Sequence, residues 1–248
     1  MKNILAIETS GNILSVAVKR KHGGLTESET TGFLKNAENL LPLADSLLKK
    51  NRLSIQAIDV FLIDRGPGSF TGLRIGFSIL KGLLEPKKRP CFGALSLDMI
   101  AENITLPEKT RLAVCLDAYK EKIYARCYHR QQGRWKPSGK AQVLTAQNCV
   151  NTIPSEVFVV GSAIKRYESF FREPESGKKI HLLTEQDWQP KASTLIRWFE
   201  QFNLDSKHLS KNKTASPLQL LKKPNDFLPL YFRRSEAEEN RNAYAASR

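Results

Sequence analysis

Two acidic residues stand where a carboxylate could do chemistry. Glu8 and Asp117 each close a run of apolar, strand-forming residues, so both are expected at strand ends. A carboxylate in such a place can hold a magnesium ion or position a water molecule. Ser10 lies two residues beyond Glu8 and could add a hydroxyl. No phosphate-gripping residues accompany them, which favours carboxylates that are solvated or that cap a helix.

The strongest signal lies in residues 66–76, which read GPGSFTGLRIG. The pattern predicts the end of a strand, a glycine turn, Ser69 as a helix N-cap and then a helix. Such a turn can hold an anion, because unpaired amides and the helix dipole face the ligand. The segment lacks the Gly-Lys-Ser/Thr of a P-loop, so a turn built for backbone geometry alone is the favoured interpretation.

The helix predicted after this turn carries more apolar surface than one core needs. At about 100° per residue, one face is bulky and a second is lined by glycines. We expect the second face, with the leucine stripe of the preceding helix, to bind another protein and Gly76 to be central. Burial of both faces within the monomer is the alternative, under which a large residue at position 76 would unfold the chain. The expected partner-binding residues are Leu40, Leu43, Leu47, Phe70, Gly72, Leu73, Gly76, Phe77, Ile79 and Leu83.

Histidine and cysteine spacing suggests neither a metal site nor a nucleophile. The four histidines are scattered, and the four cysteines contain no CxxC pair. Nothing pairs a Ser or Cys with a His at a spacing typical of a hydrolase. We therefore expect no catalytic residue, no metal and no cofactor.

Positive charge is concentrated in the second half. The net charge is +14; residues 1–104 carry 14 Lys and Arg against 10 Asp and Glu, and residues 105–248 carry 25 against 15. Nucleic-acid contact is one interpretation, because neutralising phosphates supplies much of that affinity. A solvated basic surface is the other. The candidate nucleic-acid contacts, which could instead hold the C-terminal segment against the body, are Lys222, Lys223, Arg233 and Arg234.

The order of predicted elements indicates an α/β protein with two lobes. We expect a lobe at 1–104 with the partner-binding helices, a lobe at 105–235 and a disordered tail at 236–248. Residues 203–229 look like an extended connection rather than a packed element. No apolar run reaches the roughly 18 residues of a membrane span, and no signal-peptide pattern opens the chain. We therefore expect a cytoplasmic protein.

The sequence resembles the bacterial TsaB (YeaZ) family from residue 4 to 238, most strongly before residue 105. The matching blocks read ILAIETS at 4–10, NAENLLP at 36–42, the glycine segment at 66–76, Asp117-Ala118 with Tyr124, and PLYFRRSEAE at 229–238. Three departures weaken the case for a retained polar pocket. Asn36 stands where the family often has His, Tyr119 where it has Arg, and Glu8 where Asp is commoner.

The resemblance implies an α/β fold of the two-lobed actin-like ATPase (ASKHA) class, with mixed sheets. Glu8, Ser10 and Asp117 would then mark a vestigial nucleotide cleft. It also implies a non-catalytic scaffold that binds the catalytic paralogue TsaD, in a complex with the ATPase TsaE that installs threonylcarbamoyladenosine on tRNA. TsaD holds its metal through a His-x-x-x-His pair. Ser96 and Ile100 occupy those positions here, and neither can replace imidazole.

Other functions stay open beside the scaffold. One is a nucleotide-dependent transferase or peptidase-like enzyme of the same fold. Another is a tRNA-binding module that uses the basic second half. A homodimer through the same helices also stays open, because a face made for a paralogue can pair with its own copy.

Overall fold

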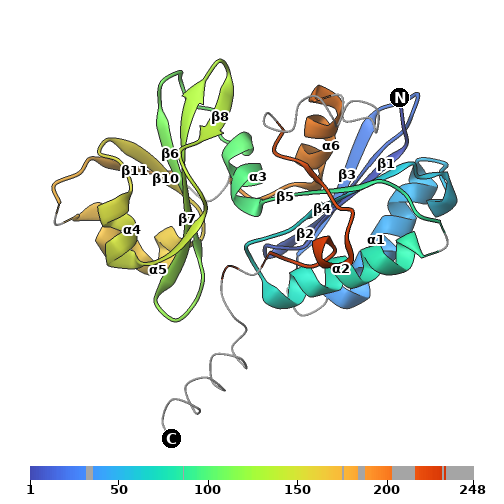
Figure 1. Cartoon of the computed structure of the whole chain (residues 1–248), viewed down its shortest axis with the longest axis horizontal. Helices are drawn as coiled ribbons and strands as arrows, with labels where there is room; N and C mark the ends of the chain where they lie inside the picture. The colour runs from blue at the N-terminus through green and yellow to red at the C-terminus, as the bar shows by residue number, and fades with distance from the viewer. Residues whose placement is uncertain are drawn as a thin grey trace, which may run out of the picture.

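The computed structural model describes residues 1–31, 36–85, 87–174, 176–183, 188–202, 216–230 and 232. Its strands form two six-stranded sheets, one in each lobe of the molecule (Figure 1). The first sheet has the order β12-β5-β4-β1-β2-β3. Its strands are β1 Ile4–Glu8, β2 Ile13–Lys19, β3 Leu25–Thr31, β4 Val60–Asp64, β5 Cys91–Ala94 and β12 Gln219–Leu220.

The second sheet has the order β11-β10-β6-β7-β8, with β9 also paired to β7. It repeats the plan of the first, since β6 pairs antiparallel with β7 and parallel with β10, as β1 does with β2 and β4. Both sheets are therefore mixed. The strands are β6 Arg111–Asp117, β7 Lys122–Gln131, β8 Arg134–Pro137, β9 Gln142–Thr145, β10 Val157–Val160 and β11 Ile180–Leu182.

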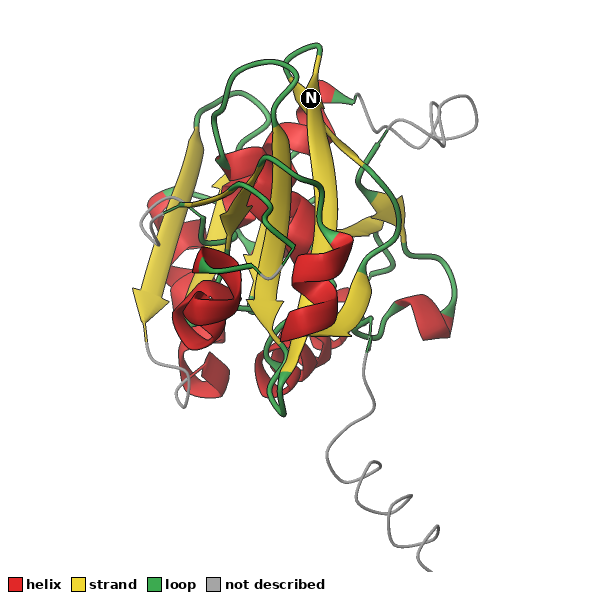
Figure 2. Ribbon diagram, turned by 90° about the vertical axis from the view of Figure 1, so that its left-hand side faces the viewer, coloured by secondary structure: helices red, strands yellow, loops and turns green. Residues whose placement is uncertain are grey.

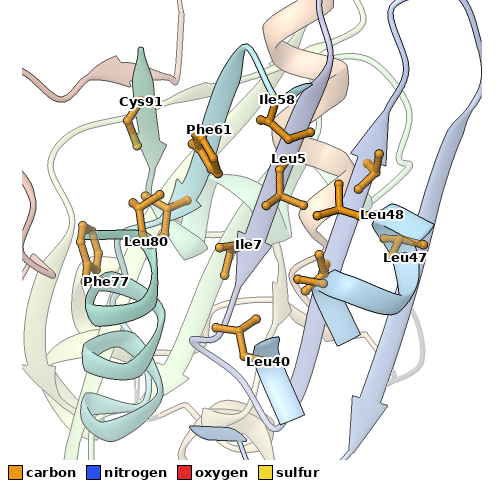
Figure 3. Close-up of a cluster of buried hydrophobic side chains, with 14 of the residues drawn as sticks. Leu5, Ile7, Leu40, Leu47, Leu48, Ile58, Phe61, Phe77, Leu80 and Cys91 are labelled. Atoms are coloured by element: carbon orange, nitrogen blue, oxygen red, sulfur yellow. The ribbon is translucent and has the colours of Figure 1, made fainter. Parts of the chain in front are cut away.

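Helices cover both faces of the first sheet, so its central strands β1 and β4 are apolar at every position except the last, which is Glu8 in β1 and Asp64 in β4. Figure 3 shows one layer, where alternate residues of β1 and β4 meet two helices, α1 and α2. The other residues of those strands meet α6. Figure 2, which looks from the second lobe toward the first, shows α-helices layered against the strands there as well. The helices are α1 Asn36–Lys50, α2 Phe70–Leu84, α3 Ser96–Asn103, α4 Ala146–Thr152, α5 Ala163–Arg172 and α6 Ala192–Gln201, with 3-10 turns at Ile55–Ala57 and Pro224–Asp226.

Two helices join the lobes. α3 follows β5 of the first sheet and lies between the two sheets (Figure 1). Its Leu97 and Ile100 pack in the core of the second lobe. α6 follows the second sheet, yet Leu195 and Ile196 pack on the first. Each lobe thus receives a helix from the other half of the chain.

This crossing changes the predicted division at residue 105. α6 and β12 fall within 105–235, but they lie on the first sheet because their apolar side chains complete its core. The expectation of an unpacked connection at 203–229 is wrong for its end, where β12 pairs with β5 and both Leu218 and Leu221 are buried. The tail predicted at 236–248 lies outside the described residues. None of the helices in the described part of the chain is long and apolar enough to cross a membrane.

Candidate functional site

Two buried carboxyl groups meet at the ends of β1 and β4. The strands are parallel neighbours with Ile7 opposite Ile63, so Glu8 and Asp64 end side by side. Both are fully buried. Asp64 was not among the site residues predicted from the sequence. It closes an apolar strand just as Glu8 does, and this position at a strand end could have predicted it.

Local donors hold one oxygen of each carboxyl group. Glu8 Oε1 accepts hydrogen bonds from the Ser10 amide at 2.5 Å and from Ser10 Oγ at 2.6 Å. Asp64 Oδ1 accepts from the Gly66 amide at 2.7 Å and from Ser96 Oγ at 2.8 Å. The other two oxygens, Glu8 Oε2 and Asp64 Oδ2, are buried without a hydrogen-bond partner.

Burial decides the protonation of this pair. It raises the pKa of Glu8 well above the usual range, and the nearby charge of Asp64 raises it further. Burial also raises the pKa of Asp64, to about 6. Two carboxyl groups this close cannot both ionise cheaply, so the pair keeps a proton at neutral pH. Because neither side chain is exposed, the pair does not line an open cleft.

Asp117 lies in the second lobe and is occupied by its own surroundings. Its amide donates to Ser162 Oγ at 3.0 Å, and its carboxylate accepts from the Tyr119 amide at 2.9 Å and from Arg166 at 3.3 Å. No hydrogen bond joins it to Glu8 or Ser10 among the described residues. Of the three residues predicted for a nucleotide cleft, Glu8 and Ser10 are therefore buried together, whereas Asp117 is a separate carboxylate that caps a turn.

The glycine stripe of α2 faces the monomer's own interior. Ser69 is the N-cap as predicted, its hydroxyl accepting from the Gly72 amide at 3.0 Å. A Cβ placed on Gly72 would meet the Thr9 carbonyl, and one on Gly76 would lie 2.6 Å from Thr9 Oγ1. The expectation that Gly76 faces a partner's helix is therefore contradicted. Burial within the monomer, the alternative, is what the structure has.

The other residues of the predicted partner-binding set divide into two groups. Four are fully buried in the first lobe: Leu40, Leu47, Leu73 and Phe77. They cannot contact a partner while the lobe stays folded. Four are half-buried at the edge of the two helices: Leu43, Phe70, Ile79 and Leu83.

The surface that α1 and α2 do expose is different. On α1, Leu41 is 47% exposed. On α2, Arg74, Ser78 and Gly82 are exposed along one side, and nothing lies within 4 Å of a Cβ placed on Gly82. The two helices contact each other, and their exposed residues are called here the outer face of α1 and α2.

Ser96 and Ile100, which occupy the positions of the metal ligands in TsaD, have structural roles here. The Ser96 hydroxyl donates to Asp64, and Ile100 is fully buried in the second core. Histidines lie apart, for His129 Nδ1 contacts Ser138 Oγ and His181 stacks on Phe158. Within the described part of the chain, no group of three His, Cys, Asp or Glu residues could hold a metal ion.

Two of the predicted nucleic-acid contacts, Lys222 and Lys223, belong to the basic second half of the chain but lie on the first lobe. Lys222 and Lys223 are exposed beside β12, and both backbone amides donate to Asp226 Oδ2. This follows from the return of the chain to the first sheet. Arg233 and Arg234 lie outside the described residues.

Comparison with known proteins supplies the family. The family described as "TsaD: tRNA N6-adenosine threonylcarbamoyltransferase" matches residues 26–180, which is more than half of the 248-residue chain. The chain belongs to the TsaD family. Within that family it is similar to proteins named tRNA threonylcarbamoyladenosine biosynthesis protein TsaB. One, from Haemophilus influenzae, is 26% identical over 189 residues, covering 72% of this chain and 80% of the relative. Another, from Escherichia coli, is 32% identical over 139 residues, covering 53% and 58%.

A solved structure agrees with these relatives. YeaZ from Pseudomonas aeruginosa matches with a TM-score of 0.71 at 25% identity, over 93% of this chain and 100% of that one. The predicted resemblance to TsaB (YeaZ) proteins is confirmed. So is the two-lobed ASKHA-like fold, which the repeated plan of the two sheets expresses directly.

Proposed function

We propose that this chain takes part in tRNA threonylcarbamoyladenosine biosynthesis as a non-catalytic subunit that binds and supports a TsaD-type catalytic paralogue. One observation carries the non-catalytic part. Where the catalytic paralogue would place imidazoles on α3, Ser96 is tied to Asp64 and Ile100 fills the second core. Neither side chain can supply the neutral nitrogen ligand that such a centre needs.

The outer face of α1 and α2 supports the binding part. On this face α1 exposes an apolar residue, Leu41, and α2 exposes the small residues Ser78 and Gly82. Small residues let a partner's helix approach closely, and half-buried Ile79 and Leu83 flank them. A paralogue of the same fold would present the equivalent pair of helices, so four helices could pack together. The same face could pair two copies of this chain when the paralogue is absent.

The alternatives have less support. A nucleotide cleft built on Glu8 and Asp117 has one carboxylate sealed in the interior and the other held by Arg166. Peptidase chemistry needs a nucleophile beside a histidine. Among the described histidines, His129 contacts Ser138, an exposed residue that follows β8, and His181 stacks on the Phe158 ring. In this proposal, the assembled complex makes the contacts with TsaE and with tRNA, and no residue of this chain is assigned to them.

Ser78→Arg and Gly82→Arg test the interface, since both sites point outward and accept a side chain without disturbing the core. Each should lower capture of the purified TsaD-type paralogue by roughly tenfold or more, the scale of a disrupted interface centre. Ser169→Arg on the exposed side of α5 is the matched control and should bind as the wild type does. Normal capture by both α2 variants would overturn this interface.

A tRNA modification assay tests the non-catalytic part. The isolated chain should form no threonylcarbamoyladenosine, and activity should appear when the paralogue and the other components are added. Turnover by the isolated chain would overturn that part of the proposal.

A further inference from the structure

A groove of about 1150 Å³ lies between the lobes and is not explained by the interface above. Arg65 and Gln219 line its first-lobe wall, Asp98 of α3 lies at its base, and Lys136 and Lys140 line its second-lobe wall. Glu8, Ser10 and Asp117 do not line it. It is therefore separate from the cleft that the resemblance implies, and it is large enough for a nucleotide.

Arg65 is a buried cation in the wall of this groove. Its side chain is only 7% exposed, and its Nε has no hydrogen-bond partner. Nη1 donates to Gln219 Oε1 at 2.8 Å. The aliphatic part crosses β5 at Gly93, where a Cβ would lie 2.5 Å from Arg65 Cγ, so only glycine leaves room. Within the described residues no carboxylate comes within 4 Å of the guanidinium; the charge of Asp226 acts from farther away.

Such a group calls for an anion. Buried charges are normally paired, because an unpaired one loses its hydration without compensation. Burial indeed lowers the pKa of the Arg65 guanidinium. Arg65 lines the groove, and a guanidinium with unpaired N–H groups suits a phosphate or carboxylate, which accepts two hydrogen bonds at once.

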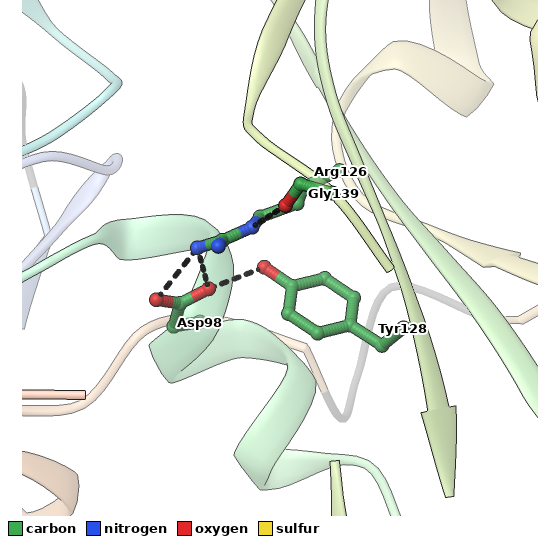
Figure 4. Close-up of polar contacts among 4 residues, drawn as sticks. All are labelled: Asp98, Arg126, Tyr128 and Gly139. Carbon is green, nitrogen blue, oxygen red and sulfur yellow. Dashed lines mark hydrogen bonds and ion pairs between the residues drawn. The ribbon is translucent and has the colours of Figure 1, made fainter. Parts of the chain in front are cut away.

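The other charges of the groove leave a positive excess. Among the described residues, its lining has five cationic side chains and two acidic ones, a net charge of +3. Asp98 is already committed, since Arg126 donates to both of its oxygens and Tyr128 to one (Figure 4). Lys136 and Lys140 are exposed at the rim, and no ion pair joins either to another described residue. The groove therefore offers an anion exposed lysines on one wall and the buried Arg65 on the other.

Aromatic rings supply a second kind of contact. Trp135, Trp198, Phe202 and Phe232 line the same groove. The two tryptophans are buried, so the half-buried Phe202 and Phe232 supply the accessible ring surface. The Arg134 guanidinium lies 5.0 Å from the centre of the Phe202 ring. Rings and guanidinium planes bind flat bases by stacking, with little preference for the base. A flat group and an anion on one ligand describe a nucleoside phosphate.

We propose that this groove binds a nucleoside phosphate, with its phosphate on Arg65 and its base on the aromatic lining. A free nucleotide and the 5′-phosphorylated end of an RNA strand share this chemistry. The site belongs to the isolated chain, so it does not depend on the paralogue, and a binding measurement tests it separately from the proposed function.

The experiment measures the affinity of the full chain for AMP, and for a short oligoribonucleotide with and without a 5′-phosphate. Arg65→Gln should weaken phosphate-dependent binding by roughly tenfold or more, the scale of a lost hydrogen bond to a charged group. Lys136→Glu with Lys140→Glu should weaken it too and flatten its dependence on salt. The matched control reverses two exposed lysines of the same lobe outside the groove, Lys165 and Lys179, and should change affinity little.

The pattern of binding separates the sources. AMP binding that needs Arg65 supports a free nucleotide, and binding of the oligonucleotide alone, dependent on its 5′-phosphate and on Arg65, supports an RNA end. If Arg65→Gln does not fold, the rim variant decides, since both of its sites are exposed. The proposal is overturned if no probe binds at millimolar concentration, or if the groove variants bind as the wild type does. Binding abolished by Asp117→Asn and unaffected by Arg65→Gln overturns it as well.

Discussion

At the scale of single residues, the Glu8–Asp64 pair links stability to pH. The pKa of Glu8 is raised in the folded chain, so the folded state keeps a proton that the unfolded state releases above the ordinary value of 4.5. Where the folded state binds more protons, stability falls as pH rises. The buried pair therefore destabilises the fold least in acid. Its unfavourable contribution to the free energy of unfolding grows from about pH 4.5 upward, until Glu8 ionises in the folded chain as well.

Glu8→Gln should remove most of this cost at neutral pH. The amide oxygen can still accept from Ser10, and the amide nitrogen can donate to the unpartnered Asp64 Oδ2. We expect the Tm at pH 7.5 to rise by roughly 2–4 °C, the shift that about 1 kcal/mol gives in a chain of this size. The advantage should vanish near pH 4. Glu29→Gln, an exposed acid on β3, should show no such pH dependence. A variant that is less stable than the wild type at pH 7.5 would contradict a protonated pair.

At the scale of elements, two of the three glycines of α2 lie in opposite environments. Gly76 faces Thr9 within contact distance, whereas nothing surrounds a Cβ on Gly82. Helix propensity favours alanine over glycine at both positions by about 1 kcal/mol. Packing should reverse the outcome at Gly76 only, because Thr9 is β-branched and cannot turn aside easily.

Gly76→Ala should destabilise the chain by about 1–3 kcal/mol, and Gly82→Ala should stabilise it by about 0.5–1 kcal/mol. Urea denaturation measures both. Adding Thr9→Ala to Gly76→Ala should restore most of the loss, because it removes the Oγ1 that lies 2.6 Å from the new Cβ. That hydroxyl has no hydrogen-bond partner, so its removal leaves no other group unpaired. If Gly76→Ala and Gly82→Ala changed the free energy of unfolding equally, contact with Thr9 would not explain why position 76 requires glycine.

The same helix shows how far the sequence alone could predict the structure. Period and capping locate α2 to within a residue, from Ser69 to Leu84. They also reveal a stripe of glycines, but not what lies against it. Thr9 comes from a strand end far away in the sequence, and only the parallel alignment of β1 and β4 brings it there. Local patterns therefore predicted the element, and the assignment of its glycine face to a partner failed.

At the scale of the whole molecule, the division into lobes depends on long-range packing. The sequence predicts two lobes because each half opens with strands. It could not predict that α6 and β12 return to the first sheet, since amphipathic helices and short apolar strands fit either core. The Arg65 groove escaped prediction for the same reason. Its walls come from β5, β8 and β12, and they meet only after the chain has crossed between the lobes twice.

The crossing helix α3 is held to the second sheet by one polar cluster. Arg126 and Tyr128 of β7 both donate to Asp98, at 2.7 Å each for the shortest contacts, and these side chains are largely buried (Figure 4). α3 follows β5 directly, so the cluster fixes the first sheet relative to the second. Exposed ion pairs contribute little, but breaking a buried one leaves its partner charge without compensation.

Asp98→Ala should therefore destabilise the chain by about 2–4 kcal/mol, because Arg126 and Tyr128 lose their common acceptor. Asp45→Ala is the matched control, since the Asp45–Lys49 pair has side chains 61% and 76% exposed. Its loss should change the free energy of unfolding by less than about 0.5 kcal/mol. Urea denaturation followed by tryptophan fluorescence measures both. Removing Arg126 as well should cost less than the two single changes summed, by about 1 kcal/mol or more, because the pair acts as a unit. If Asp98→Ala is no more harmful than Asp45→Ala, the apolar contacts of α3 suffice to hold the lobes together.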